Sequence, residues 1–387
     1  MVTYKCNLNC IHCAAANLRD TNFMRSSYPG KLPSNIKIFD EAVYEKEFLQ
    51  KFLSLLDSNN CKFRVNFSPN AGESTIIKGF VDIWNTVSRR KGVRSLTLTT
   101  NGSKFHVIIK NLDLTKLESV TLSLDGSQER IHDCIRGPGS FKAVITSMKM
   151  LEKMACGKDS KSFDIQINYT LNGLNASSLS SLPYVLGNFT HPLLINIIKV
   201  SLAQGNAKRN ERILSISSSQ ATDSVREFFE ELARINDARQ ENGLGRIRCR
   251  LQGFTAREIF SIIKRVKRIV YDDFLLYAGE GRFCGVLMKG RVVIDPFGNV
   301  FPCLEFTYKE VLNDFLRKFG KLEIPHISTI SSMDGVLYDR FFECARDWIG
   351  ELYLFENLPC ADCSFSSTCT VCPIETHYRG LPDVCKQ

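Results

Sequence analysis

The stretch CNLNCIHC, residues 6–13, places Cys6, Cys10 and Cys13 in a C-x3-C-x2-C run. It directly follows a short extended segment, so we expect a loop that leaves a strand and turns three thiolates toward one face. Thiolates are the ligands of iron-sulfur clusters, and three cysteines on a 4Fe-4S cluster leave one iron open. A zinc site needs a fourth ligand, and His12 points the wrong way in so tight a loop. The run therefore predicts an iron-sulfur site.

Composition sets the outer limits of the interpretation. The chain has 387 residues, of which 44% are hydrophobic, so two domains are expected. No apolar run is long enough to span a membrane and the N-terminus has no export signal, which predicts a cytoplasmic protein without a membrane partner. The 15 cysteines cluster at ligand spacings, which favours metal ligation over disulfides. The net charge of +9 suits an acidic partner, but bound thiolates would offset it.

Apolar runs alternate with amphipathic stretches through the first half of the chain. The runs read as strands and are residues 63–67, 96–102, 120–126, 165–169 and 194–200, with an amphipathic stretch at 44–56. Such alternation predicts an α/β fold with a parallel sheet. Farther on, apolar spacing predicts helices at 227–235 and 257–270 and a strand at 246–251, while the serine-rich segment 210–223 reads as an exposed connector.

The C-terminal third carries a second group of cysteines. Cys284, Gly298 and Cys303 follow a C-x13-G-x4-C pattern, and the segment 292–298 reads as a β-hairpin. The later members are Cys360, Cys363, Cys369, Cys372 and Cys385. A zinc ribbon would account for residues 360–372 and leave the others unexplained. Cys344 lies in an amphipathic helical stretch, where a ligand and a buried thiol are equally good interpretations. The remaining cysteines lack ligand spacing and are interpreted as structural thiols: Cys61, Cys134, Cys156 and Cys249.

Taken together, these motifs resemble the radical S-adenosylmethionine (SAM) enzymes of the peptide-modifying branch that carry a C-terminal SPASM domain. The resemblance implies a partial (β/α)6 TIM-like barrel over residues 1–210 and a helical bridge or connector over 211–283. It also implies a SPASM domain over 284–387, built on a β-hairpin and cysteine-rich loops that bind auxiliary clusters.

The same resemblance implies S-adenosylmethionine and three 4Fe-4S clusters as cofactors. The implied cofactor contacts are His12, Gly72, Glu73, Asn101, Ser123 and Arg136. Auxiliary cluster I would be held by Cys284, Cys303 and Cys372, with Cys344 as a candidate fourth ligand, and cluster II by Cys360, Cys363, Cys369 and Cys385. The family has Gly where this chain has Ala71, and its spacing is one residue longer between Cys369 and Cys372. No cysteine precedes Cys284 closely, so an open iron on cluster I is expected unless Cys344 fills it.

For function, the resemblance implies a maturase of ribosomally made peptides. It would abstract a side-chain hydrogen through a 5′-deoxyadenosyl radical and install a C-C or thioether crosslink. The alternatives are a formylglycine-type sulfatase maturase, which has an aspartate where Leu304 follows Cys303, and a small-molecule dehydrogenase or epimerase. A non-catalytic electron carrier is disfavoured, because it has no use for three-cysteine ligation. Catalytic acids or bases are suggested by location alone at Glu305, Asp272 and Asp273.

The expected partners are a precursor peptide and an external electron donor such as flavodoxin or ferredoxin. Only five residues precede Cys6, so the expectation is that a separate protein or the barrel and SPASM surfaces recognise the leader, or that the chain has been trimmed. No aromatic platform for nucleic acid is present. A cationic face is either solvated or a binding surface for an acidic leader, and consists of Arg246, Arg248, Arg250, Lys264, Arg265, Lys267 and Arg268.

Overall fold

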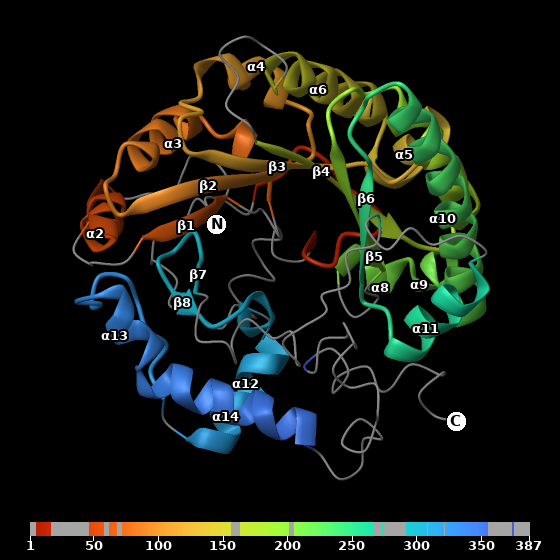
Figure 1. The fold of residues 1–387 in the computed structure, drawn as a ribbon. Coiled ribbons are helices and arrows are strands. Elements are labelled where there is room, and N and C mark those ends of the chain that lie inside the picture. Colours follow the sequence, from red (N-terminus) through yellow and green to blue (C-terminus); the bar gives the residue numbers. More distant parts are fainter. Residues whose placement is uncertain are drawn as a thin grey trace.

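The computed structural model describes residues 5–16, 46–57, 62–67, 72–155, 163–200, 205–266, 273, 292–307, 309–320, 322–354 and 374. Its centre is a curved sheet of six parallel strands, each paired with the next strand along the chain. The strands are β1 (Phe63–Phe67), β2 (Val93–Thr100), β3 (Leu117–Ser123), β4 (Asp164–Leu171), β5 (Leu193–Lys199) and β6 (Arg248–Gln252). Helices cover the convex face (Figure 1), so the sheet is a partial (β/α) barrel.

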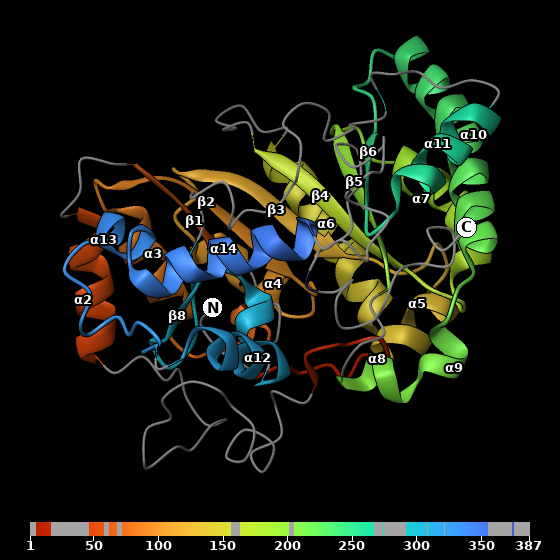
Figure 2. The ribbon, with the colours of Figure 1, turned by 90° about the horizontal axis from the view of Figure 1, so that it is seen from below.

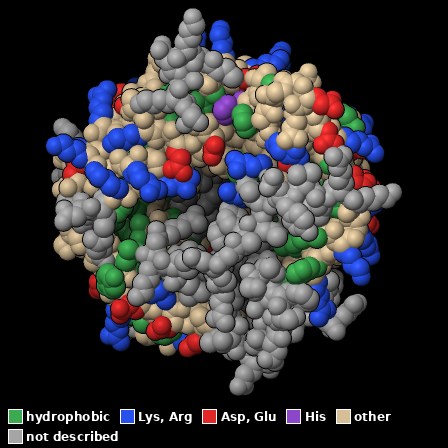
Figure 3. Space-filling model, in the orientation of Figure 1, with side chains coloured by type: hydrophobic (Ala, Val, Ile, Leu, Met, Phe, Trp, Pro, Cys, Tyr) green, Lys and Arg blue, Asp and Glu red, His purple; other side chains and the backbone are tan. Residues whose placement is uncertain are grey.

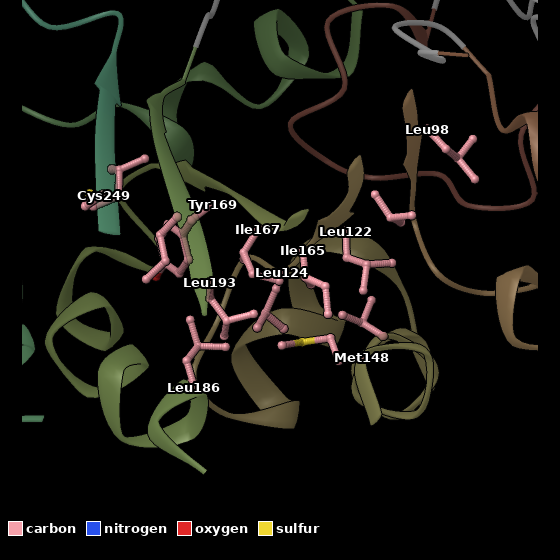
Figure 4. Close-up of a cluster of buried hydrophobic side chains, with 14 of the residues drawn as sticks. Leu98, Leu122, Leu124, Met148, Ile165, Ile167, Tyr169, Leu186, Leu193 and Cys249 are labelled. Atoms are coloured by element: carbon pink, nitrogen blue, oxygen red, sulfur yellow. The ribbon is translucent and has the colours of Figure 1, made fainter. Parts of the chain in front are cut away.

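Alternating side chains give the sheet its two faces. In β4, Ile165, Ile167 and Tyr169 are buried, whereas Gln166 and Asn168 between them are only partly covered. The buried set packs with neighbouring strands against the helices of the convex side, as the cluster in Figure 4 shows. Because burying an aliphatic side chain contributes about 1.5–3 kcal/mol, this continuous cluster fixes the register of the strands.

Helices connect the strands and cover them. Those of this part of the chain are α2 (Lys46–Asp57), α3 (Phe80–Ser88), α4 (Phe105–Ile108), α5 (Glu129–Arg136), α6 (Ser140–Ala155), α7 (Leu182–Gly187), α8 (Gly205–Arg209), α9 (Glu211–Leu214), α10 (Ser218–Glu241) and α11 (Ala256–Arg265). Short 3-10 helices are η2 (Ser74–Ile76), η3 (Ile109–Asn111) and η4 (Ala176–Ser181). The helices predicted at 44–56, 227–235 and 257–270 correspond to α2, α10 and α11.

The segment predicted as an exposed connector is largely helical. Residues 210–223 include α9 and the start of α10, where Ser217 and Gln220 form a capping box. The hydroxyl of the capping serine accepts a hydrogen bond from a backbone N–H in the first turn of the helix, so serine residues here mark the start of a helix. The strand predicted at 246–251 is confirmed as β6. It joins the main sheet beside β5, so the sheet continues into the segment interpreted as a bridge.

The C-terminal part forms a smaller unit. The predicted hairpin is confirmed, since β7 (Val293–Ile294) pairs antiparallel with β8 (Val300–Phe301). Helical elements follow as η6 (Leu304–Thr307), α12 (Lys309–Phe319), α13 (Met333–Leu337) and α14 (Arg340–Leu354). In both ribbon views these helices lie across the open side of the curved sheet (Figures 1 and 2).

A second hydrophobic core joins this unit to the barrel. Its centre is an aromatic group with ring centroids 5.1–6.1 Å apart, formed by Phe306, Phe315, Phe341 and Trp348. Ala15 and Leu55 belong to the same core, so the segment after the cysteine run and helix α2 pack against the C-terminal unit. None of the helices in the described part of the chain combines the length and apolar character that a membrane crossing requires.

Candidate active site

Backbone hydrogen bonds fix the cysteine loop, residues 5–16, to the ends of barrel elements. The Glu73 N–H donates to the Lys5 carbonyl at 2.7 Å, which ties the start of the loop to the segment after β1. The Ile11 N–H donates to the Ile135 carbonyl at 3.0 Å, which ties its middle to the last turn of α5. The loop therefore lies where the carboxyl ends of parallel strands converge, the usual position of active sites in such folds.

Helix α8 holds the other side of the loop, and the two segments are adjacent in both ribbon views (Figures 1 and 2). The Asn206 amide donates to the Cys10 carbonyl at 3.0 Å and to Asn9 Oδ1 at 2.8 Å, while the Asn206 N–H donates to the Cys13 carbonyl at 3.0 Å. Gly205 has φ +61°, and an added Cβ would lie 2.5 Å from the Cys13 carbonyl oxygen. Only glycine allows this approach, because it has no Cβ.

Asn101 lies beside the first cysteine. Its side-chain amide donates to Asn7 Oδ1 at 3.1 Å and lies 3.9 Å from Cys6 Sγ, within range of a weak N–H···S contact. Its carbonyl oxygen accepts from the Ser103 N–H at 2.9 Å. Asn101 was predicted as a cofactor contact, and the structure gives it contact with the cysteine loop itself. Hydrogen bonds to sulfur are a common means of tuning iron-sulfur clusters.

Glu73 is buried and links two strand ends. Its Oε1 accepts from the Thr75 hydroxyl at 2.6 Å and the Thr100 hydroxyl at 2.7 Å, and its Oε2 accepts from the Asn101 N–H at 2.7 Å. Burial raises the pKa of this carboxyl, although these hydrogen bonds act in the opposite direction. Oε2 retains capacity for a further donor such as an ammonium group. Gly72, also buried, precedes it, while Ala71 lies outside the described residues.

A buried ion pair lies beneath the loop. Arg136 Nε–H donates to Asp125 Oδ2, and both side chains are almost completely covered. The Cys10 sulfur is 4.0 Å from the Arg136 backbone carbonyl oxygen, and the guanidinium is close enough to Cys10 and Cys13 to interact with both electrostatically. Burial disfavours the charge of Arg136, but Asp125 and Cys10 favour it and raise the pKa of the guanidinium. A fixed cation beside the thiols suits an anionic cluster.

His12 extends into the same network. Its Nε2 lies 3.5 Å from Asp125 Oδ2. Burial lowers the pKa of His12 to about 4, although Asp125 opposes this shift, so the ring is neutral near pH 7. The tautomer with its proton on Nε2 suits the neighbouring carboxylate and leaves Nδ1 as an acceptor.

Ser123 occupies the last position of β3, in register with Asn168 of β4. It is less buried than Leu122 before it, which places it on the concave face with the partly covered polar residues of β4. On that face the Asn196 amide of β5 donates to Asn168 Oδ1 at 3.0 Å. The molecule is hollowed near the middle of the view in Figure 3, with Lys and Arg side chains along part of the rim. The concave face is therefore polar.

These residues fit an iron-sulfur cluster and a polar cofactor. Buried polar atoms are normally hydrogen-bonded, yet His12 Nδ1 and Ser127 Oγ have no partner among the described residues. No three His, Cys, Asp or Glu side chains in the described ranges are grouped closely enough to hold a single metal ion. Cluster ligands each bind a different iron and so do not need to converge on one point. Burial raises the pKa of Cys10 to about 11, so loading with metal releases its proton.

Most of the second cysteine group lies outside the described residues. This applies to Cys284, Cys360, Cys363, Cys369, Cys372 and Cys385, and to Asp272. Cys303 follows the confirmed hairpin, and Cys344 is partly buried on α14, as predicted for that stretch. Both pack against the second core, as does Cys13 of the cysteine loop.

The suggested acids and bases find little support in the geometry. Asp273 is buried and accepts two hydrogen bonds from Arg246, an arrangement typical of a structural ion pair. Glu305 lies in η6, after the hairpin, and is partly exposed. Because Arg246 is engaged in this pair and Arg265 lies 3.8 Å from Asp223, the cationic face is not a uniform set of solvated charges.

Sequence reasoning missed several residues that the structure brings to the loop. Asp125 lies near the end of the predicted strand run 120–126 and was assigned no role, although a carboxylate at a strand end is a recognisable signal. The Asp125 backbone N–H donates to His132 Nδ1 at 3.0 Å, so Nδ1 is the acceptor nitrogen of that ring. Asn206 and Asn210 follow β5, and nothing in the sequence indicates that they reach the cysteine loop. The Asn210 amide donates to the Ile11 carbonyl at 3.1 Å.

Comparisons with known proteins agree with this arrangement. The family model of the Radical SAM superfamily matches residues 1–163. A GTP 3′,8-cyclase from Peptoclostridium acidaminophilum is 26% identical over 149 residues, which cover 38% of this chain and 40% of that protein. Mycofactocin maturase MftC from Mycobacterium tuberculosis (strain ATCC 25618 / H37Rv) is 28% identical over 153 residues, which cover 39% of this chain and 32% of that protein. The matches therefore span less than half of these relatives.

Solved structures match over nearly the whole chain. Native anSMEcpe with bound AdoMet superposes with a TM-score of 0.56 at 16% identity, covering 97% of this chain and 95% of that one. Streptococcus suis SuiB gives a TM-score of 0.56 at 13% identity, covering 96% of this chain and 70% of that one. At these identities the likeness shows the fold alone.

Proposed function

We propose that this chain, whose residues 1–163 match the family model of the Radical SAM superfamily, is a radical SAM enzyme that matures a ribosomally made precursor peptide. In this proposal it removes a hydrogen atom from a peptide side chain and installs a C-C or thioether crosslink, with a proton and one electron leaving as the bond closes, and the auxiliary clusters would accept that electron. The observation that carries the proposal is the three-cysteine loop, clamped at the carboxyl ends of the strands beside a buried arginine. The similarity to a protein named as a maturase, MftC, supports a peptide as the substrate class.

The proposed roles follow the contacts of each residue. Cys6, Cys10 and Cys13 would hold a 4Fe-4S cluster, with the Asn101 amide near the first sulfur. When bound, the cluster and S-adenosylmethionine supply the one-electron chemistry that removes a hydrogen atom from the substrate. The remaining residues bind and orient.

The polar end of S-adenosylmethionine finds matching groups in this proposal. Its carboxylate suits the Arg136 guanidinium, because the planar fork of arginine matches two oxygens. Its ammonium group suits Glu73, whose Oε2 has spare acceptor capacity. Ser123 on the concave face and His12 in the loop complete the proposed contacts. The second core packs against the same loop, an arrangement that would help to exclude water from the reacting atoms.

We also propose that the C-terminal unit holds two auxiliary 4Fe-4S clusters. The hairpin that Cys303 follows supports this assignment, and the partial burial of Cys344 against the second core keeps it a candidate ligand of cluster I. Full reconstitution should then give about twelve iron atoms per chain. Cys344→Ala decides between a ligand and a buried thiol, because loss of one auxiliary cluster means a ligand and unchanged iron means a thiol.

A flavodoxin or ferredoxin is the proposed electron donor, and a separate protein is a proposed carrier of the peptide leader. A small-molecule substrate is the second candidate. It is favoured by the GTP 3′,8-cyclase, which matches a similar length of chain at similar identity. The sulfatase-maturase alternative is disfavoured, because Leu304 follows Cys303 at the position where those enzymes are expected to have an aspartate.

The experiment that tests the proposal is peptide conversion. The reconstituted enzyme, reductant and S-adenosylmethionine are incubated with a short precursor peptide encoded beside the gene, and the product is analysed by tandem mass spectrometry. A crosslink appears as the loss of a pair of hydrogen atoms and a gap in the fragment series. Formylglycine in a sulfatase peptide, or turnover of a nucleotide or sugar with no change in the peptide, would contradict it. Cys134→Ala, which alters an exposed thiol on α5, is the matched control for the cysteine variants.

A further inference from the structure

Asp125, which follows β3, is a fully buried carboxylate that joins four parts of the site. Its Oδ1 accepts from the Thr170 N–H of β4 at 2.6 Å. Its Oδ2 accepts from Arg136 Nε–H and lies 3.5 Å from His12 Nε2. Its backbone N–H donates to His132 Nδ1 at 3.0 Å. The hydrogen bond from Thr170 therefore orients the Asp125 side chain independently of its contacts with Arg136 and His12.

The site requires an ionised carboxylate at this position. Both oxygens face N–H donors, and an ionised carboxylate is the one small side chain that accepts on both. The isosteric amide of asparagine would turn an NH2 group toward either Thr170 or Arg136. A buried arginine also needs a counter-charge, because an unpaired charge in a dry site is strongly disfavoured. Asp125 supplies that charge from a fully buried position, since its side chain has 0% exposure.

The pairing leaves part of the arginine available. Arg136 uses Nε toward Asp125, and its two Nη nitrogens have no hydrogen-bond partner among the described residues. The residue lies at the cysteine loop, as the contact of its carbonyl with Cys10 shows. An arginine held at Nε presents its Nη groups in a fixed direction, and such preorganisation lowers the entropy lost when an anion binds.

We propose that Asp125 is the positioning residue of the cofactor site: it holds Arg136 by Nε so that the Nη groups face the carboxylate of S-adenosylmethionine. It anchors His12 of the cysteine loop through the same oxygen. Asp125 does not touch the cofactor and acts through the arginine. The inference rests on the proposed function, in which Arg136 contacts the cofactor.

The test measures cofactor binding rather than turnover. Anaerobically reconstituted full-length protein is titrated with S-adenosylmethionine by calorimetry, and the electron paramagnetic resonance spectrum of the reduced cluster is recorded with and without it. Asp125→Asn should weaken binding about tenfold or more and reduce the spectral change on addition of the cofactor. Asp133→Asn is the matched control, because Asp133 lies on α5, as Arg136 does, but its carboxylate accepts from the Gly139 and Phe141 N–H groups and forms no ion pair with that arginine. It should bind as the unmodified protein does.

A double-mutant cycle separates positioning from general stability. If Asp125 acts through Arg136, the double variant Asp125→Asn/Arg136→Ala should bind no more weakly than Arg136→Ala alone. Additive losses, or an Asp125→Asn variant with unchanged affinity and spectrum, would overturn the inference while leaving the proposed function intact. Unchanged affinity in Arg136→Ala would instead remove the proposed cofactor contact, and the inference with it.

Arg136→Lys is a second test of the inference, to be used if Asp125→Asn does not fold. Lysine keeps the charge and the pairing with Asp125, but its single nitrogen cannot hold one anion at Nε and present a separate fork to another. Its affinity for S-adenosylmethionine should therefore fall about tenfold or more although iron content is retained. An Arg136→Lys variant that binds as tightly as the unmodified protein would contradict the bridging role that Asp125 is proposed to fix.

Discussion

Gly205 offers a direct test of how closely helix α8 supports the cysteine loop. Its backbone has φ +61°, a conformation that costs other L-residues about 1–2 kcal/mol. An alanine Cβ would in addition lie 2.3 Å from the Ala14 carbonyl oxygen and 2.5 Å from that of Cys13, and both are backbone atoms. Overpacking of this kind costs about 1–3 kcal/mol. Gly205→Ala should therefore lose roughly 2–5 kcal/mol of local stability or move the loop.

The assay is iron content and 5′-deoxyadenosine formation after anaerobic reconstitution. Gly205→Ala should lose the N-terminal cluster and the cleavage activity while keeping its far-ultraviolet circular dichroism. Gly243→Ala is the matched control, because Gly243 has φ +68° but nothing within 4 Å of an added Cβ. If both variants retain the cluster equally, the close approach of α8 to the Cys13 carbonyl has no part in cluster binding.

Two further predictions concern the scaffold. The buried Arg239 side chain donates hydrogen bonds to five backbone carbonyls, those of Gly187, Phe189, Thr190, His191 and Gly245. Arg239→Met should therefore lower the free energy of unfolding, measured by urea titration, by about 2–4 kcal/mol. Arg234→Met, at an exposed ion pair, is the control and should lower it by about 0.5 kcal/mol. Burial opposes ionisation of Asp133, but hydrogen bonds from Phe141, Gly139 and Ser140 lower its pKa below the usual value. The stability it contributes is then present above the unfolded pKa of about 3.9 and is lost as pH falls through the folded pKa, so the gap between unmodified protein and Asp133→Asn should be full at pH 7 and close in acid.

The strands of the barrel could be predicted because each is a local apolar run of the right length. The membership of β6 in the sheet could not, because its partner β5 is separated from it by three helices and alternation alone does not name a partner. The serine-rich segment before α10 is mostly exposed, as composition predicts, and the helix that begins there could also have been recognised, because Ser217 and Gln220 carry the spacing of a capping box. Local patterns thus identify elements more reliably than they identify their neighbours.

The same division holds for the site. Cys6, Cys10 and Cys13 are predictable because their chemistry depends on spacing within one loop. Asp125 is not, because its importance arises from Thr170 and His12, which are brought to it only by folding. Its hydrogen bonds to other elements cannot be predicted from the sequence of any one segment.

The most direct test of the account is cleavage of S-adenosylmethionine by the reduced, reconstituted protein. Unmodified protein and Cys134→Ala should form 5′-deoxyadenosine and methionine in equal amounts. A variant with alanine at Cys6, Cys10 and Cys13 should form none while keeping the iron of the C-terminal unit. Equal cleavage by the triple variant, or zinc in place of iron at the N-terminal site of the unmodified protein, would contradict the assignment of the cysteine loop as the catalytic centre.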